Sequence, residues 1–307
     1  MWVPPLLLER KEHLSPRNPY FDHAQYQSWI AYRDGNAVGR ISAQIDQLHL
    51  EHHQENEGFF GMIEAEDNAD TFKALLNTAE TWLRDHGMRR ILGPYNLSIN
   101  QEAGLLVDGF DTPPCLMMGH ARPYYRTRIE KNGYQKAKDL LAYIIDSNFD
   151  HPAAIKAVVK RAKKRVTVRS LRKSHYDEDM KIVENIFNDA WSENWGFIPY
   201  TEAEFKQLAK DFKLILDFNL LKIAEVDGVP AAFMATVPNI NEAIRDLNGR
   251  LLPFGWLKLL WRLKVRYPQT ARIPFMGVRK QYHGSLLGAA LAFMVIIDGQ
   301  PYGCLLY

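Results

Sequence analysis

The pattern of apolar and polar positions in the first half of the chain predicts strands that alternate with helices. Two short apolar runs flank Arg33-Asp34-Gly35-Asn36, whose residues favour the tight turn of a β-hairpin. Residues 69–86 carry apolar residues at helical spacing, with Asp70 as the expected N-cap and Gly87 as the residue that ends the helix. The other elements predicted in this half are strands at residues 27–31, 37–44, 58–65, 89–93 and 140–145 and a helix at residues 124–133.

The second half repeats this general order of elements. Asp150-His151-Pro152 favours the start of a helix, because proline is well tolerated in a first turn. Strands are predicted at residues 165–171, 220–226, 229–237 and 273–278, and further helices at residues 178–191, 201–216, 251–265 and 284–297. The composition changes near residue 150, so we expect two α/β domains, residues 1–149 and 150–307, with the order of elements of an internal duplication.

Composition narrows the class of protein. The 307 residues are 47% hydrophobic and 24% charged, which suits folded domains and excludes a disordered chain. The net charge of +2 gives no overall case for nucleic acid. Two cysteines, far apart in the sequence, exclude a disulfide scaffold and a cysteine-based zinc site. With no signal peptide at the N-terminus and no membrane-spanning apolar run, we expect a cytoplasmic protein.

The most specific stretch of the sequence is residues 273–291, where an apolar strand leads through a polar turn into an apolar helix. A turn of this kind directs backbone N–H groups outward at the start of a helix, where the helix dipole adds positive potential. Arg279, Lys280 and His283 add positive or partly positive charge. The pattern therefore predicts a site for an anion such as a pyrophosphate.

This stretch resembles the acetyl-CoA motif of the GNAT acyltransferase superfamily, in which a strand enters an Arg/Gln-x-x-Gly-x-Gly/Ala loop. Gly288 matches the second Gly/Ala of the motif, whereas His283 stands where the family has Arg or Gln and Leu286 stands where it has the first Gly. The resemblance implies a mixed, mostly antiparallel sheet flanked by helices. It also implies binding of acetyl-CoA or a longer acyl-CoA by Val278, Arg279, Lys280, His283, Gly284 and Gly288.

The first half is similar to the same superfamily in residues 78–87, which resemble the end of the CoA-motif helix, and in residues 124–134, a Tyr-bearing helix that ends in Gly-Tyr. Residues 64–70, ahead of the first helix, contain no Gly and four acids, and such a loop repels a pyrophosphate. We therefore interpret residues 1–149 as a degenerate GNAT-like domain without CoA binding. Residues 93–114, with Lys136-Ala137-Lys138-Asp139, are similar to bacterial tandem-GNAT proteins of the YghO type.

Proteins of that type begin further upstream and continue further downstream, so we expect a chain shortened at both ends with an incomplete second domain. The resemblance implies transfer of an acyl group from acyl-CoA to a small amine acceptor, with no metal and with the catalytic base and acid unassigned. A catalytically inactive GNAT-like binding module, or a gene remnant, remains the alternative. A second copy of the chain could cover the sheet edge left by the missing elements, so a homo-oligomer stays open.

The acceptor pocket is predicted around the aromatic segment that links two helices. Trp191, Asn194, Trp195 and Phe197 lie in it, and aromatic side chains on a connecting loop are suited to binding, although they also serve to cover a core. Glu225 and Asp227 are carboxylates near the central hairpin, but a turn and a solvent-facing strand position explain them more simply.

Three further patterns are weighed against structural explanations. His49, His52 and His53, beside several acids, have the spacing of metal ligands, but a polar surface loop is the interpretation that we favour. Nine basic residues lie between Lys156 and Lys173 with no acid among them, and such a stretch suits a DNA-associated regulator. The same stretch lacks the aromatic residues that stack on bases. The apolar and basic residues 251–266 suit a membrane surface or a long acyl chain, although we favour a helix packed over a sheet.

Overall fold

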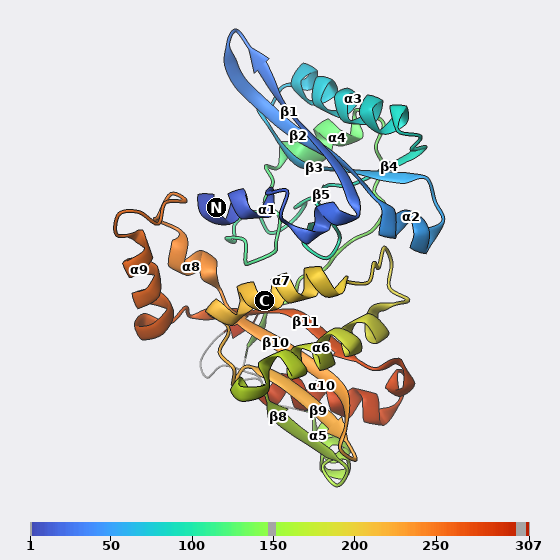
Figure 1. Cartoon of the computed structure of the whole chain (residues 1–307), viewed down its shortest axis with the longest axis vertical. Coiled ribbons are helices and arrows are strands. Elements are labelled where there is room, and N and C mark those ends of the chain that lie inside the picture. Colours follow the sequence, from blue (N-terminus) through green and yellow to red (C-terminus); the bar gives the residue numbers. More distant parts are fainter. Residues whose placement is uncertain (1, 147–151, 299–304, 307) are drawn as a thin grey trace. The chain divides into compact units, whose positions relative to one another are not determined.

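The computed structural model describes residues 2–146, 152–298 and 305–306, and the chain divides into two compact units, residues 1–141 and 142–307 (Figure 1). The boundary predicted at 149/150 falls outside the described residues.

The first unit is built on a four-stranded sheet with the order β1-β2-β3-β4. Its strands are β1 (Ala24–Arg33), β2 (Asn36–Asp46), β3 (Glu57–Ala65) and β4 (Arg90–Leu92), and a separate two-stranded ladder joins β5 (Tyr95–Asn96) and β6 (Glu102–Ala103). Its helices are α1 (Leu7–His13), α2 (Gln47–His53), α3 (Ala69–Asp85) and α4 (Tyr124–Glu130). The pairing of Arg33 with Asn36 confirms the predicted two-residue hairpin turn.

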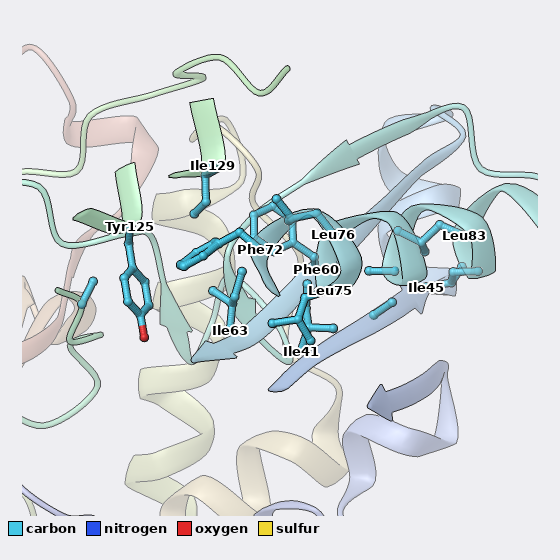
Figure 2. Packing of buried hydrophobic residues seen from close by; sticks show 13 residues of the cluster. Ile41, Ile45, Phe60, Ile63, Phe72, Leu75, Leu76, Leu83, Tyr125 and Ile129 are labelled. Carbon is cyan, nitrogen blue, oxygen red and sulfur yellow. The ribbon is translucent and has the colours of Figure 1, made fainter. Parts of the chain in front are cut away.

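The core of this unit lies between α3 and one face of the sheet (Figure 2). Phe72 and Leu76 of α3 are fully buried against Ile41 of β2 and Phe60 of β3, and Tyr125 of α4 closes one end. The helical spacing seen in the sequence therefore produces the apolar stripe that the sheet covers. Burial of these side chains is the main source of stability for this unit.

Three predictions for the first unit are wrong. The N-cap of α3 is Asn68, whose side chain accepts hydrogen bonds from the backbone N–H groups of Asp70 and Thr71. Residues 140–144 form no strand, and only β7 (Ile145–Asp146) follows them. The His49 region is helix α2 and not a loop, because the Asp46 side chain caps its first N–H groups, and His49 itself is buried.

The second unit contains a six-stranded sheet with the order β7-β12-β11-β10-β9-β8. Its strands besides β7 are β8 (Val166–Ser170), β9 (Leu221–Val226), β10 (Val229–Pro238), β11 (Thr270–Val278) and β12 (Leu305–Leu306). Its helices are α5 (Ala153–Ala162), α6 (Tyr176–Trp191), α7 (Glu202–Ile215), α8 (Ile240–Ile244), α9 (Gly255–Trp261) and α10 (Leu286–Asp298), with a π-helical turn at Arg262–Arg266 after α9.

The two units share one order of elements. In each, a hairpin leads to a third antiparallel strand, then to a helix, and then to a strand parallel to the third: β1-β2-β3-α3-β4 in the first unit and β9-β10-β11-α10-β12 in the second. The predicted fold class, two halves each with a mixed, mostly antiparallel sheet flanked by helices, is confirmed. The loop between β11 and α10 therefore corresponds to the acidic loop between β3 and α3.

Candidate functional site

A cavity of about 650 Å³ opens in the second unit where β11 ends, α10 begins and α6 ends. It brings together side chains that are far apart in the sequence. Four of the predicted CoA-binding residues line it, namely Val278, His283, Gly284 and Gly288, together with Trp191 and Asn194 from the predicted acceptor pocket. The CoA-binding residues and the acceptor pocket were predicted as separate sites, but residues of both groups line the same cavity.

One side of β11 is open beside this cavity. β10 pairs with β11 from Ala271 as far as Val278, whereas β12 pairs with it only at Thr270 and Ala271. In the part of the chain that the structure describes, no strand follows β11 on that side toward Val278. An open strand edge can hydrogen bond to an extended ligand, because its N–H and C=O groups are spaced like those of a missing strand.

Trp191 at the end of α6 fixes the position of that edge. Its indole Nε1 donates a hydrogen bond of 2.7 Å to the carbonyl oxygen of Met276, and its ring stacks on Phe187. Gly277 lies next in the strand, where a Cβ would stand 3.1 Å from the Cβ of Ala190. The end of α6 thus packs closely on β11. No local pattern in the sequence indicates the link between Trp191 and Met276, which are 85 residues apart.

The turn ahead of α10 is held by Ser285. Its hydroxyl donates to the carbonyl oxygen of Tyr282 at 2.6 Å and accepts from the backbone N–H of Gly288 at 2.9 Å, as an N-cap does. A Cβ on Gly288 would lie 2.0 Å from the same Tyr282 oxygen, so only glycine fits there. Ser285 was not among the predicted site residues, although a serine directly before a helix is an ordinary capping signal.

Three backbone N–H groups of this turn have no acceptor within the part of the chain that the structure describes. Among the described residues, the structure gives no hydrogen-bond partner for the N–H groups of Gly284, Leu286 and Leu287. Gly284 has a positive φ of +67°, which reverses the chain direction just before the helix. Unpartnered N–H groups at the start of a 13-residue helix favour an anionic ligand.

The predicted cationic side chains hold the turn in place. Arg279 donates to the side-chain oxygen of Asn185 at 2.7 Å and to the carbonyl oxygen of Pro230 at 2.8 Å. Lys280 pairs with Glu193 at 2.8 Å, and its backbone N–H binds Asp189. Neither Arg279 nor Lys280 lines the cavity.

His283 lines the cavity and is exposed, and its Nε2 lies 2.6 Å from the carbonyl oxygen of Val278. Tyr282 also lines the cavity, and these two are the titratable side chains among its described lining residues. Leu286, at the position of the first motif Gly, is 71% exposed on the cavity rim.

The remaining predicted acceptor residues lie elsewhere. Phe197 is buried and packs near Phe187 in the core under α6, so its place fits the structural interpretation. Trp195 is 40% exposed and does not line the cavity.

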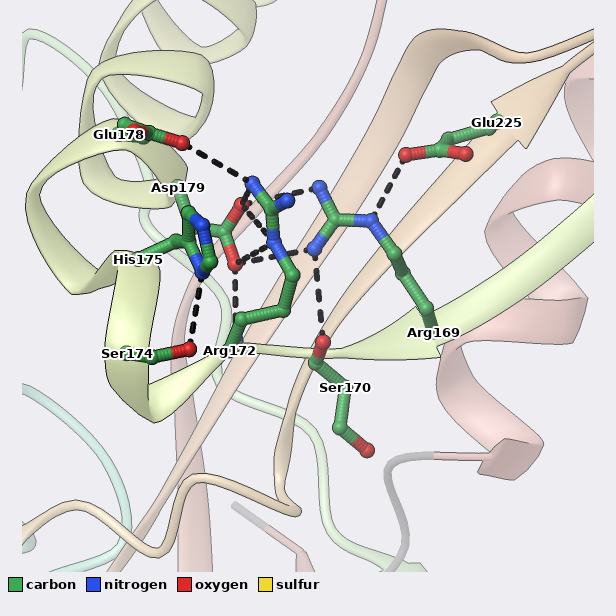
Figure 3. A network of polar contacts seen from close by, with 8 residues as sticks. All are labelled: Arg169, Ser170, Arg172, Ser174, His175, Glu178, Asp179 and Glu225. Carbon is green, nitrogen blue, oxygen red and sulfur yellow. Dashed lines mark hydrogen bonds and ion pairs between the residues drawn. The ribbon is translucent and has the colours of Figure 1, made fainter.

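The acids of the central hairpin are held in ion pairs, and Figure 3 shows the pair that Glu225 forms. Glu225 pairs with Arg169 at 2.7 Å, and Asp227 pairs with Arg165. Hydrogen bonds from Arg165 lower the pKa of Asp227. Neither carboxylate lines the cavity, and Arg165 and Arg169 belong to the basic stretch considered for DNA binding.

Figure 3 also shows Asp179, the fully buried acid of α6, between Arg169 and Arg172. Burial of this carboxyl raises its pKa, but hydrogen bonds from Arg172 and Arg169 outweigh that effect and lower the pKa to about 2. These three residues tie β8 to the first turn of α6, whose last two residues line the cavity.

Metal ligands do not gather elsewhere in the described part of the chain, where no group of three or more His, Cys, Asp or Glu side chains could hold a metal ion. His49 pairs instead with Glu57 at 3.2 Å.

Comparison with known proteins identifies relatives over almost the whole chain. No protein-family model matches it. Protein YghO of Escherichia coli is 48% identical over 296 residues, which cover 96% of this chain and 76% of that protein. A protein named bacterial ceramide synthase, of Caulobacter vibrioides, is 50% identical over 298 residues, which cover 96% of this chain and 78% of that protein. The chain belongs to the YghO-like family.

Solved structures give more distant similarities. A GCN5-related N-acetyltransferase from Sphaerobacter thermophilus has a TM-score of 0.48 at 12% identity, covering 98% of this chain and 74% of that one. A tandem GNAT protein from the clavulanic acid biosynthesis pathway has a TM-score of 0.46 at 10% identity, covering 97% of this chain and 77% of that one. The fold of this YghO-like chain is defined by its own strand order and helices.

Proposed function

We propose that this chain is an N-acyltransferase that moves a long acyl group from acyl-CoA to an amine. The observation that carries the proposal is the single cavity in which the turn before α10, the open side of β11 and the end of α6 meet. An acyl donor and an amine must lie in contact to react, and one cavity supplies that proximity.

The donor would lie along β11. Its pantetheine arm carries amide groups, which suit the open strand edge between Ala271 and Val278. Its pyrophosphate suits the unpartnered N–H groups of Gly284, Leu286 and Leu287. Arg279 and Lys280 then act by fixing the turn through Asn185 and Asp189, and the cationic contribution to binding is small.

In the proposed reaction the amine nitrogen attacks the thioester carbonyl carbon, so a C–N bond forms and the C–S bond breaks. The amine loses one proton, and the departing CoA sulfur takes up one proton. Backbone N–H groups of the strand edge would stabilise the oxyanion. His283 is placed to move the amine proton, because an Nε2–H donated to Val278 leaves Nδ1 as an acceptor.

The acceptor class follows from the relative named bacterial ceramide synthase, which is 50% identical over 96% of this chain. A ceramide is the amide of a fatty acid with a long-chain amino alcohol. We propose that this chain takes the same two classes of substrate. The apolar lining residues Ala190, Met276 and Ala289 suit alkyl chains.

Titration of the purified chain with acetyl-CoA and palmitoyl-CoA by calorimetry tests donor binding. Leu286→Glu is expected to weaken binding about tenfold, because it adds a negative charge on the cavity rim facing the pyrophosphate. Leu286 is exposed, so the change leaves packing intact. Ile30→Glu is the matched control, because the Ile30 side chain on β1 of the first unit is also exposed, and this variant should bind like the wild type. Equal affinities for all three proteins would remove the turn from the binding site.

A further inference from the structure

The segment around α9 exposes large apolar side chains to solvent. Neither α9 nor the π-helical turn that follows it has a buried residue. Figure 1 shows α8 and α9 at the margin of the second unit's sheet. The exposed apolar residues are Leu252, Phe254, Trp256, Leu257, Leu260, Trp261, Val265 and Tyr267, with exposed fractions from 44% to 79%. We call residues 252–267 the α9 patch. The sequence-based preference for a helix packed over a sheet is wrong for this segment.

The side chains that do face the protein hold the α9 patch in a fixed conformation. Arg262 donates to the carbonyl oxygen of Ala243 in α8 at 2.7 Å and pairs with Asp246, which also binds Lys258. The Trp256 backbone N–H donates to Leu251. The apolar side chains are thus presented outward by an anchored helix, and they do not collapse onto the sheet.

Positive charge surrounds these apolar side chains. Residues 245–267 contain six basic residues, Arg245, Arg250, Lys258, Arg262, Lys264 and Arg266, against the single acid Asp246, a net charge of +5. Because the whole chain carries +2, all other residues together carry −3. Positive charge and exposed apolar side chains therefore occur together in this segment.

We propose that the α9 patch binds the surface of a bilayer that contains anionic lipids. Tryptophan and tyrosine rings favour the boundary between headgroups and acyl chains, leucine and phenylalanine enter the acyl region, and lysine and arginine meet the phosphates. A helix of this length cannot cross a bilayer, and among the described residues no helix is long and apolar enough to do so. The α9 patch therefore lies in the plane of the membrane surface.

Charge distinguishes a membrane from a second copy of this chain. A two-fold dimer through the α9 patch would place one copy of the segment 245–267, of net charge +5, against another, and like charges at an interface oppose association. An anionic bilayer complements both the charge and the apolar side chains. This inference stands apart from the proposed acyl transfer, since none of the residues that line the cavity belongs to the α9 patch.

Co-sedimentation of the full chain with phosphatidylcholine vesicles, with and without about 30% phosphatidylglycerol, tests the inference. We expect binding that is stronger to the anionic vesicles and that weakens as salt is raised. The combined variant Trp256→Ser, Leu260→Ser, Trp261→Ser should lose at least about tenfold in vesicle affinity. The matched control Ile30→Ser, Tyr32→Ser changes side chains of similar exposure on β1 and should bind like the wild type.

A second variant separates charge from insertion. Lys264→Gln with Arg266→Gln keeps every apolar side chain and should lose only the preference for anionic vesicles. Absence of wild-type binding to both vesicle types would overturn the inference, as would unchanged binding by the triple-serine variant. A wild-type dimer that this variant dissociates, without vesicle binding, would assign the α9 patch to self-association instead. Calorimetry with acetyl-CoA on the same variants should be unchanged, so a failed function and a failed membrane site are distinguishable.

Discussion

Replacing Asp179 with alanine is expected to lower the free energy of unfolding of the second unit by about 2–4 kcal/mol. The Asp179 carboxylate is fully buried and accepts hydrogen bonds from the guanidinium groups of Arg169 and Arg172 and from the Arg172 backbone N–H. Removing it leaves two guanidinium groups and a backbone N–H without their acceptor. The Arg169 and Arg172 side chains are 25% and 43% exposed, so water compensates part of the loss. Hydrogen exchange of the whole protein at increasing urea concentration, followed on peptic peptides from each unit, shows which unit loses stability.

The neighbouring acid supplies the control. Glu178 is 68% exposed and lies 3.6 Å from Arg172, so Glu178→Ala should change stability by less than about 0.5 kcal/mol. The wild type also has a predicted pH dependence. Because hydrogen bonding holds the pKa of Asp179 at about 2, its stabilising contribution is present above its ordinary pKa of 3.8 and is lost as pH falls from there toward 2. Asp179→Ala should lack this loss. An acid transition of equal steepness in both proteins would contradict the role given to this network.

Gly288→Ala is expected to weaken acyl-CoA binding by at least about 100-fold, because the turn cannot keep its shape. The new Cβ would lie 2.0 Å from the Tyr282 carbonyl oxygen, which also accepts from Ser285. The backbone must move, and the N–H groups at the start of α10 move with it. The matched control is Gly228→Ala, in the turn between β9 and β10, which does not line the cavity and where no atom lies within 4 Å of the added Cβ.

The two substitutions separate the shape of the loop from a general cost in stability. Gly228→Ala costs about 1 kcal/mol, because φ is positive there, but it should leave affinity within a few-fold of the wild type. Calorimetry measures both proteins under the same conditions. Equal loss in the two variants would mean that a general loss of stability, and not the closeness of Gly288 to Tyr282, governs binding.

Local signals predicted much of the fold because they act over a few residues. The turn Asp34-Gly35 fixes the register of β1 and β2, and the apolar stripe of α3 appears where its spacing placed it. The signals were ambiguous where two residues compete for one position. Asn68 and Asp70 are both good capping residues, and only the structure shows that Asn68 fills that place.

Errors arose where tertiary contacts decide. An apolar run such as residues 140–144 becomes a strand only beside a partner, and Leu141 is 72% exposed instead. The apolar residues of α9 suggested a helix packed on the sheet, because spacing alone cannot show which face has a neighbour. For the site, the motif predicted the turn before α10. It did not predict that Trp191 would donate a hydrogen bond to Met276 and line the cavity.

The most direct test of the proposed function is a transfer assay with purified chain, palmitoyl-CoA and a long-chain amino alcohol such as sphinganine. Mass spectrometry would follow the amide, and a thiol reagent would follow free CoA. We predict amide and free thiol in equal amounts, with both lost in Gly288→Ala and retained in Gly228→Ala. A folded wild-type chain that binds palmitoyl-CoA yet forms no amide with this amine or with other primary amines would contradict acyl transfer and identify the chain as an acyl-CoA-binding protein.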